Sequence, residues 1–277
     1  MALTRCIAGQ KHSELNKAKV QGDYPVARGG LADVYRATLS DGSTVAVKCI
    51  RQFTDEKYVK HTARELSTWA KLKNDNILEL FGLAIFRNCL AMVSPWMELG
   101  NVHHAIKINP NLDRYRLCKQ LATVIKYLHE VENVIHGDIK GENILMASDG
   151  TLKLTDFGLA IMHDKTLQFS ETDPGGGTAR WMAPELYLDG ARRCRETDIY
   201  AMGYVGKLPF HEIRGGGAII KAVLDGRTPE VSELDQRPIS PRAHIMIGTL
   251  HRCWRRDAKE RATVAEVLGL LNLVGNV

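Results

Sequence analysis

The sequence predicts an α+β fold with two lobes, a smaller β-rich lobe over about residues 21–94 and a larger helical lobe over about residues 98–274. Two observations predict it. Before residue 94, short runs alternate between apolar and polar residues with the period of half-buried strands. From residue 114 onward, apolar residues recur at the spacing of amphipathic helices. The change of pattern places the boundary near residues 94–101, and residues 1–20 are expected to form an N-terminal extension.

The smaller lobe is expected to hold strands and one helix. Asp41-Gly42 is a tight-turn signal, because glycine adopts the backbone angles that such a turn requires. On the expected helix, Ala63, Leu66 and Ala70 share one apolar side. The expected elements are two strands around a glycine turn within 24–37, a strand at 44–50, a helix at 58–72, and an antiparallel pair at 77–85 and 89–93 that bends at 87–88.

The larger lobe is expected to be mostly helical. Its strongest signal is an amphipathic helix at 114–130, whose apolar stripe comprises Leu117, Leu121, Val124, Ile125 and Leu128. Short strands and loops are expected over 131–160, and the polar, glycine-rich stretch 164–178 predicts a mobile loop. Further helical patterns lie at 184–188, 218–225, 245–252 and 264–273.

Composition excludes several classes of protein. The net charge of +5 is spread along 277 residues without a basic block, so no nucleic-acid partner is expected. The polar N-terminus predicts no signal peptide, and no run reaches the ~18 apolar residues of a membrane helix. Six scattered cysteines form no C-x-x-C pair, which favours reduced thiols over a zinc site or disulfides. We therefore expect a soluble cytoplasmic protein without a membrane partner.

The run His136–Asn143, followed by Asp156-Phe157-Gly158, carries the strongest chemical signal. A carboxylate held in a tight loop, such as Asp138, can accept a hydrogen bond from a hydroxyl and then its proton. Lys140 can neutralise charge on a migrating phosphoryl group, and Asn143 and Asp156 offer the hard oxygen ligands that Mg²⁺ prefers. These groups suit phosphoryl transfer from a magnesium-bound nucleotide. The alternative is a loop in which Asp138 and Asn143 only cap local backbone amides.

Lys48 lies on the expected strand at 44–50, with Ala46 and Ile50 on the same side. A lysine that points into an apolar face needs a partner, because an unpaired buried ammonium is very costly. Glu65 on the following helix is the natural candidate. The alternative is an exposed lysine on an edge strand.

These motifs together resemble those of the eukaryotic protein kinases, of the serine/threonine or tyrosine-kinase-like type, and the resemblance covers roughly residues 24–271. It implies a bilobal kinase fold. The stretches that carry it are Thr44–Lys48 with Glu65, the loop His136–Asn143, Asp156–Gly158, Met182–Glu185 with its expected ionic partner Arg261, and Cys253-Trp254. An aspartate equivalent to Asp198 anchors the catalytic loop in such proteins.

The resemblance implies transfer of the γ-phosphoryl group of ATP, with Mg²⁺, to a serine or threonine of a protein substrate. It makes Asp138 the base, Lys140 the γ-phosphate contact, the Lys48–Glu65 pair a phosphate anchor, and Asn143 and Asp156 the metal ligands. Lys140 also favours serine/threonine over tyrosine specificity. The residues implied at the nucleotide are Ala27, Gly29 and Gly30 in the phosphate loop, Val34 and Ala46 above the adenine, Leu145 below it, and Ser94, Pro95 and Met97 at the gatekeeper and hinge.

The sequence departs from the family pattern in three places. The phosphate loop, residues 27–32, reads ARGGLA and keeps only the central glycine of G-x-G-x-x-G. Gly137 replaces an arginine that commonly grips a phosphate, so Thr166, Ser170 and Thr172 are expected to be ordinary solvated loop residues. Relative to the family pattern, roughly six residues of the central helix are missing after Val205, which corresponds to ~9 Å of helix.

The shortened helix predicts lower stability or lower activity than in a full-length relative. A catalytically weak pseudokinase that acts as a binding scaffold is therefore the alternative function. A small-molecule phosphotransferase is a third possibility, against which the substrate-loop ending Ala183–Glu185 argues. His103-His104 is predicted to be a surface pair without metal. The sequence leaves the oligomeric state and the physiological substrate open.

Overall fold

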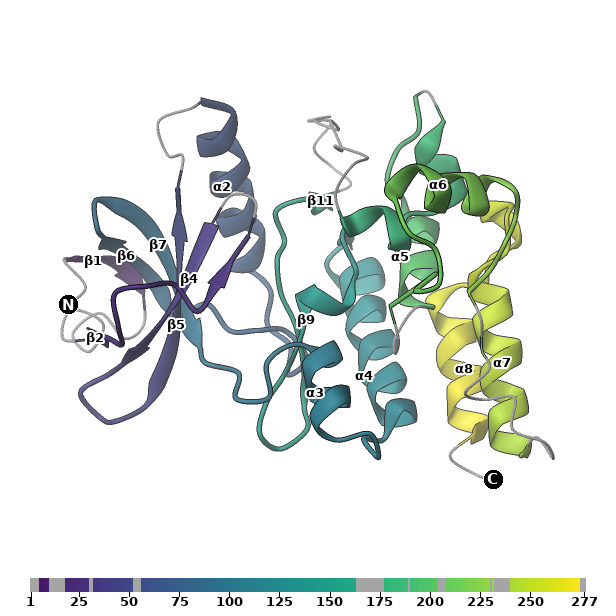
Figure 1. Ribbon diagram of the computed structural model, residues 1–277, viewed down its shortest axis with the longest axis horizontal. Coiled ribbons are helices and arrows are strands. Elements are labelled where there is room, and N and C mark those ends of the chain that lie inside the picture. Colours follow the sequence, from purple (N-terminus) through teal and green to yellow (C-terminus); the bar gives the residue numbers. More distant parts are fainter. Residues whose placement is uncertain are drawn as a thin grey trace. The chain divides into compact units, whose positions relative to one another are not determined.

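A computed structural model describes residues 5–9, 18–29, 32–51, 56–162, 177–188, 190–203, 208–229, 231 and 240–274. The chain divides into two compact units between Glu98 and Leu99. The first unit is rich in strands and the second in helices, as the sequence predicts (Figure 1). None of the described helices combines the length and the apolar character needed to cross a membrane.

The first unit is built on one antiparallel sheet with the strand order β1-β6-β7-β5-β4-β2, and β3 also pairs with β4. In Figure 1 the helix α2 lies beside this sheet. The elements are β1 (Arg5–Gly9), β2 (Lys19–Val20), β3 (Ala27–Arg28), β4 (Ala32–Thr38), β5 (Thr44–Ile50), α2 (Glu56–Trp69), β6 (Gly82–Phe86) and β7 (Cys89–Pro95).

The expected strands at 44–50 and 89–93 are present as β5 and β7, whereas the strand predicted over 77–85 is confined to β6. The strand pair expected within 24–37 is present as β3 and β4, and residues 30–31 of its turn lie outside the described residues. Two further strands join the sheet. Both turn residues between β6 and β7, Arg87 and Asn88, have positive φ, which matches a tight hairpin. β1 pairs with β6 and β2 with β4, so the sheet includes residues that precede position 21. The two residues of β2 are too few to show an alternating pattern, although Val20 is buried.

The helix α2 buries a different side from the one predicted. Ala63 and Ala70 are exposed, whereas Thr62, Glu65 and Thr68 are buried. Two polar interactions explain the difference: Glu65 turns inward to an ion pair, and the indole N–H of Trp69 donates to the carbonyl of Leu78. The apolar spacing was therefore a wrong guide to the packed face of this helix.

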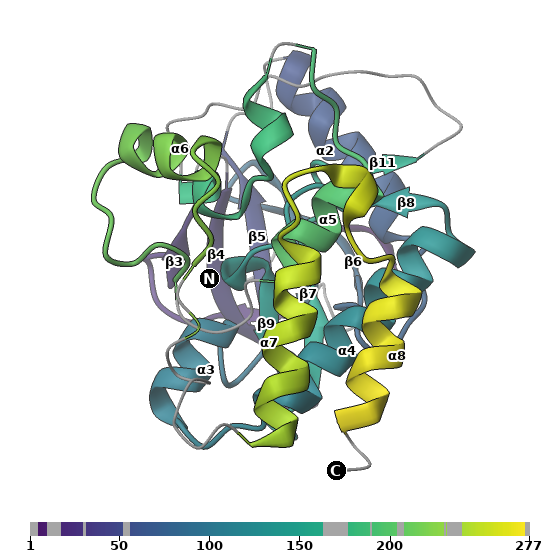
Figure 2. The ribbon, with the colours of Figure 1, turned by 90° about the vertical axis from the view of Figure 1, so that its right-hand side faces the viewer.

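The second unit is organised around three helices, α4 (Arg114–Lys126), α7 (Pro241–Cys253) and α8 (Val264–Val274). Both α4 and α7 pack along α8 (Figure 2). The predicted apolar stripe of α4 is confirmed, since its members from Leu117 to Leu128 are all buried. The chain leaves α4 through a π-helical turn, η1 (Tyr127–Val131), so the regular helix ends four residues earlier than predicted.

Short elements fill the rest of the second unit. The helix α5 has only eight residues, in keeping with the shortened central helix. It ends at Met202, and the next residue, Gly203, lies directly against the buried ring of Trp254. The other elements are α3 (Val102–Ile108), β8 (Val134–Ile135), η2 (Gly141–Asn143), β9 (Ile144–Met146), β10 (Leu152–Leu154), β11 (Ile161–Met162), η3 (Gly177–Trp181), η4 (Pro184–Tyr187), α5 (Arg195–Met202), α6 (Gly216–Leu224) and η5 (Ala258–Glu260).

Part of the sequence predictions lies outside the described residues. This applies to most of the expected mobile loop, with Thr166, Ser170 and Thr172, and to residues 204–207, which follow α5 directly. Whether the shorter helix lowers stability or activity stays a prediction.

Candidate active site

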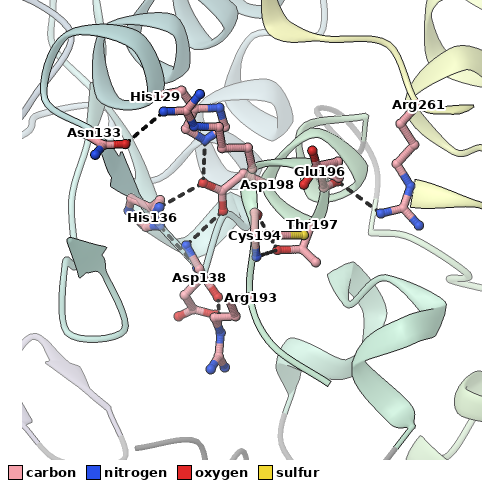
Figure 3. Close-up of polar contacts among 12 residues, drawn as sticks. His129, Asn133, His136, Asp138, Arg193, Cys194, Glu196, Thr197, Asp198 and Arg261 are labelled. Atoms are coloured by element: carbon pink, nitrogen blue, oxygen red, sulfur yellow. Dashed lines mark hydrogen bonds and ion pairs between the residues drawn. The ribbon is translucent and has the colours of Figure 1, made fainter. Parts of the chain in front are cut away.

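The loop before Asp138 is held by one buried carboxylate. Asp198, near the start of α5, accepts hydrogen bonds from the backbone N–H of His136 through Oδ2 and of Gly137 through Oδ1, each at 2.8 Å. Its Oδ2 also lies 2.9 Å from Nε2 of His129 (Figure 3). Only 1% of Asp198 is exposed. The predicted anchoring of this loop by Asp198 is therefore confirmed.

His136 links this loop to the segment that carries Asp156. The N–H of Asp138 donates to Nδ1 of His136, so Nε2 carries the ring proton and donates to the carbonyl of Thr155 at 3.2 Å. The ring also makes an edge contact with Phe157, with the two centroids 5.0 Å apart. The histidine thus keeps the two motif loops in a fixed relation to each other.

The two oxygens of Asp138 have different surroundings. Oδ2 accepts hydrogen bonds from Nζ of Lys140 at 2.6 Å and from Nδ2 of Asn143 at 3.0 Å. Oδ1 is buried and has no hydrogen-bond partner among the described residues. A buried oxygen without a donor is costly, and an incoming hydroxyl would supply that donor. The carboxylate is therefore suited to accept a proton at Oδ1 while Oδ2 keeps it in place.

The Asn143 amide and Asp156 come together through a hairpin. In the β9–β10 pair Ile144 lies opposite Leu154, and the N–H of Thr155 donates to the carbonyl of Asn143 at 3.0 Å. Asp156 follows with φ of 68°, which turns the chain at that residue. The alternative of simple amide caps is not favoured, because among the described contacts the Asn143 side chain donates to the carbonyl of Asp138.

These residues fit a magnesium ion. Nδ2 of Asn143 is occupied by Asp138, which leaves the amide oxygen as the atom available for a cation. One amide oxygen and the Asp156 carboxylate are two hard ligands, and Mg²⁺ usually takes one or two protein ligands together with phosphate oxygens and water. Within the described part of the chain, no cluster of three or more His, Cys, Asp or Glu residues offers another metal site.

In the first unit, Lys48 and Glu65 form the predicted ion pair. Nζ of Lys48 lies 2.7 Å from Oε1 of Glu65, and the Glu65 side chain is only 3% exposed. Lys48 lies on the half-buried face of β5, which is a central strand between β4 and β7. The alternative of an exposed edge-strand lysine is therefore wrong.

The sheet of the first unit also gathers most of the residues predicted at the nucleotide. The strand register pairs Ala46 with Ser94, and Ala27 with Val34. Ser94 is buried, and the N–H of Trp96 donates to the carbonyl of Thr44, which fixes the segment after Pro95. Of the other predicted residues, Met97 is half-buried and Gly29 is exposed in the first unit, Leu145 lies on β9 in the second unit, and Gly30 lies outside the described residues.

Two further contacts of the second unit involve residues of η3 and η4. Arg261 binds both carboxylate oxygens of Glu185, at 2.5 and 2.7 Å, as the resemblance predicts. His103, predicted on the surface, is instead packed against Gly141 and Trp181, while His104 is exposed. The prediction was wrong for His103 because α3, which carries it, was not recognised in the sequence.

Sequence reasoning also missed two polar neighbours of the site. His129 binds Asp198, and Arg193 donates from Nε to the carbonyl of Gly137 at 2.8 Å. Each contact joins residues more than 55 positions apart, and neither residue belongs to a motif. The sequence signal that could have pointed to Arg193 is the pair of adjacent arginines Arg192-Arg193, and it does not indicate which residue Arg193 binds.

Comparison with known proteins yields one family. The family model of the protein kinase domain matches residues 23–270. Mitogen-activated protein kinase kinase kinase 4 of Homo sapiens is 31% identical over 266 residues, which cover 90% of this chain and 16% of that protein. L-type lectin-domain containing receptor kinase I.3 of Arabidopsis thaliana is 30% identical over 240 residues, which cover 84% of this chain and 33% of that protein.

A third relative is named a dual specificity kinase. Dual specificity protein kinase pyk3 of Dictyostelium discoideum is 27% identical over 280 residues, which cover 96% of this chain and 19% of that protein. The chain therefore spans between 16% and 33% of the length of these three relatives.

Proposed function

Because the chain belongs to the protein kinase family, we propose that it transfers the γ-phosphoryl group of ATP to serine or threonine hydroxyls of proteins. The observation that carries the proposal is the arrangement around Asp138. One oxygen is fixed by Lys140 and Asn143, and the other is buried without a described partner. That arrangement suits a general base that accepts the proton of a substrate hydroxyl.

In the proposed reaction, the substrate hydroxyl donates its proton to Oδ1 of Asp138 while its oxygen attacks the γ-phosphorus. The bond from that phosphorus to the β,γ-bridging oxygen breaks, and ADP leaves with the bonding electron pair. Lys140, which is 2.6 Å from Asp138, stabilises the charge on the transferred group. Asn143 and Asp156 hold Mg²⁺, which neutralises phosphate charge when bound. Lys48, oriented by Glu65, contacts the phosphates of ATP.

The choice of serine and threonine rests on Lys140, which resembles the residue of serine/threonine kinases at this position. A relative is named a dual specificity kinase, so the identity of the phosphorylated residue needs a direct measurement. Protein substrates follow from the family, and their identity is open. We also propose a cytoplasmic location, since the five cysteines with described side chains are free thiols.

The test is transfer of radiolabelled phosphate from ATP to a generic Ser/Thr protein substrate. We expect label on the substrate with the wild type and background counts with Asp138→Asn, while Asp149→Asn, an exposed turn residue, keeps wild-type transfer. Acid hydrolysis of the product should release phosphoserine or phosphothreonine. Equal background counts for wild type and Asp138→Asn would reject the kinase, and phosphotyrosine alone would overturn the Ser/Thr assignment.

A scaffold with little or no catalysis is the second candidate. The observation that favours it is the eight-residue helix α5, because this helix carries Asp198 and so supports the catalytic loop. The same assay separates the two candidates. A scaffold predicts ATP binding or partner binding without any difference in turnover between wild type and Asp138→Asn.

Lys48→Met is expected to lower phosphate transfer by about 10²–10³-fold, because it removes a charge proposed to stabilise the phosphates. It also leaves the Glu65 carboxylate, which is almost fully buried, without its cation. Initial rates at saturating ATP measure the effect. Lys71→Met is the matched control, since Lys71 is an exposed lysine of the same unit. Rates of Lys48→Met within about threefold of the control would contradict the proposed role of Lys48.

A further inference from the structure

Arg193 is distant from the catalytic loop in the sequence but contacts its backbone in the structure. It lies in the segment before α5, and its Nε donates to the carbonyl of Gly137 at 2.8 Å. Figure 3 shows its guanidinium beside Asp138, away from the buried end where His129 meets Asp198. The side chain is half-buried, and this hydrogen bond is its described polar contact. Neither a motif nor the proposed mechanism uses this residue.

Gly137 leaves the space that Arg193 occupies. A Cβ at position 137 would lie 2.5 Å from Cδ of Arg193 and 2.9 Å from the carbonyl oxygen of Leu159. The φ of Gly137 is +77°, which side chains other than glycine rarely adopt. The glycine is thus required both by its backbone angle and by the arginine that packs against it. A side chain at 137 and the present position of Arg193 exclude each other.

The contact with Arg193 completes the fixation of the peptide that leads into Asp138. The N–H of Gly137 is bound by Asp198, and the N–H of Asp138 by the His136 ring. The carbonyl of Gly137 is the remaining polar group of that peptide, and Arg193 binds it. Glycine has the greatest backbone freedom of any residue, so an unbound carbonyl here would let the peptide rotate. Rotation of this peptide would reorient Asp138.

The charge of Arg193 acts in the same direction as its hydrogen bond. Burial lowers the pKa of its guanidinium, while the carboxylates of Asp138 and Asp198 act to raise it. The guanidinium therefore lies in the field of both carboxylates that organise the loop. A cation in this position attracts Asp138 through space, since no described hydrogen bond joins Arg193 to Asp138.

We propose that Arg193 is a positioning residue for phosphoryl transfer, which holds Asp138 in its reactive orientation by binding the Gly137 carbonyl in the space that the glycine leaves open. This inference rests on the proposed kinase function. Misplacement of a reacting group by about 1 Å can cost a factor of ~10² in rate, so the effect should fall on kcat. Because the described hydrogen bond of Arg193 goes to the backbone of Gly137, substrate binding is expected to stay unchanged.

The test compares steady-state kinetics and thermal melts of the full chain carrying single substitutions. Arg193→Met, which keeps the length of the side chain but has no donor and no charge, is expected to lower kcat by about 10–100-fold. KM for ATP and for the protein substrate should stay within about twofold, and Tm within about 4 °C of the wild type. Arg193→Lys keeps a cationic donor, so its fold-decrease in kcat should be less than about a third of that of Arg193→Met.

Arg195→Met is the matched control, because Arg195 is an exposed arginine two residues further along that binds only the side chain of Asn133 among the described residues. It should keep wild-type kcat. The inference is overturned if Arg193→Met keeps kcat within about twofold of the wild type while Asp138→Asn is inactive, or if kcat falls only in proportion to the unfolded fraction. If the wild type does not exceed Asp138→Asn, the proposed function itself is rejected, and this inference is rejected with it.

A second pair of variants tests the shared space directly. Gly137→Ala should lower kcat in the wild type, since its Cβ meets Cδ of Arg193. In an Arg193→Ala background that Cδ is absent. The fold-decrease in kcat caused by Gly137→Ala should therefore be about threefold or more smaller there than in the wild-type background. Equal fold-losses in both backgrounds would contradict the coupling of Gly137 with Arg193.

Discussion

Asp198→Ala is expected to destabilise the second unit by about 3–5 kcal/mol and to reduce phosphate transfer to background. The substitution removes the acceptor for the N–H groups of His136 and Gly137 and the partner of the His129 ring. Each buried donor that loses its acceptor costs about 1–3 kcal/mol. The loop would then lose the geometry that orients Asp138, so stability and activity should fall together.

Denaturant unfolding and the radiolabel assay measure the two effects on the same preparations. Asp198→Asn should lie between wild type and Asp198→Ala, because an amide keeps one acceptor oxygen but cannot accept through its nitrogen. Asp149→Ala is the control, as Asp149 is an exposed aspartate in a turn of the same unit. A loss below about 1 kcal/mol for Asp198→Ala would show that the loop is held by other contacts.

Glu185→Gln is expected to lower the free energy of unfolding by about 3–5 kcal/mol, because it leaves the guanidinium of Arg261 buried without its counter-charge. The Arg261 side chain is 0% exposed, whereas that of Glu185 is 26% exposed. Glu185 accepts two hydrogen bonds from Arg261, which also binds the carbonyls of Arg255, Glu196 and Arg256. This pair joins η4 to the region between α7 and α8.

A double-mutant cycle with Arg261→Met separates the pair from its parts. The double variant contains no unpaired charge, so it should be at least about 1 kcal/mol more stable than the sum of the single losses predicts. The exposed pair Arg227 and Glu212, whose charged atoms are 3.4 Å apart, is the matched control and should show a coupling below about 1 kcal/mol. Coupling as weak as in this control would mean that Glu185 and Arg261 do not stabilise each other.

The contacts that sequence reasoning could predict are those between motif residues with complementary chemistry. The pairing of Lys48 with Glu65 is predicted because a lysine that points into an apolar face needs a partner, and the ion pair is present. The contacts of Arg261 with Glu185 and of Asp198 with the loop before Asp138 are implied by the resemblance to protein kinases, and both are present. The buried side of α4 could be predicted from the helical spacing of its apolar residues, because neighbouring elements cover that helix along one side.

What sequence reasoning missed depends on distant neighbours. The buried side of α2 is set by Glu65 and Trp69, whose partners lie on other elements and cancel the apparent apolar stripe. The contact of Arg193 with Gly137 spans 56 positions. The sequence shows that position 137 has no side chain, but it does not show which residue occupies that space. His103 belongs to α3, whose seven residues are too few to give a periodic pattern.

The end of α5 has a consequence for how this chain can change. The last residue before residues 204–207 is Gly203, where a Cβ would lie 2.3 Å from Nε1 of Trp254. Trp254 caps the C-terminal end of α7, and it is buried. Any other residue at position 203 therefore depends on a smaller one at position 254. The two positions should therefore show strong epistasis.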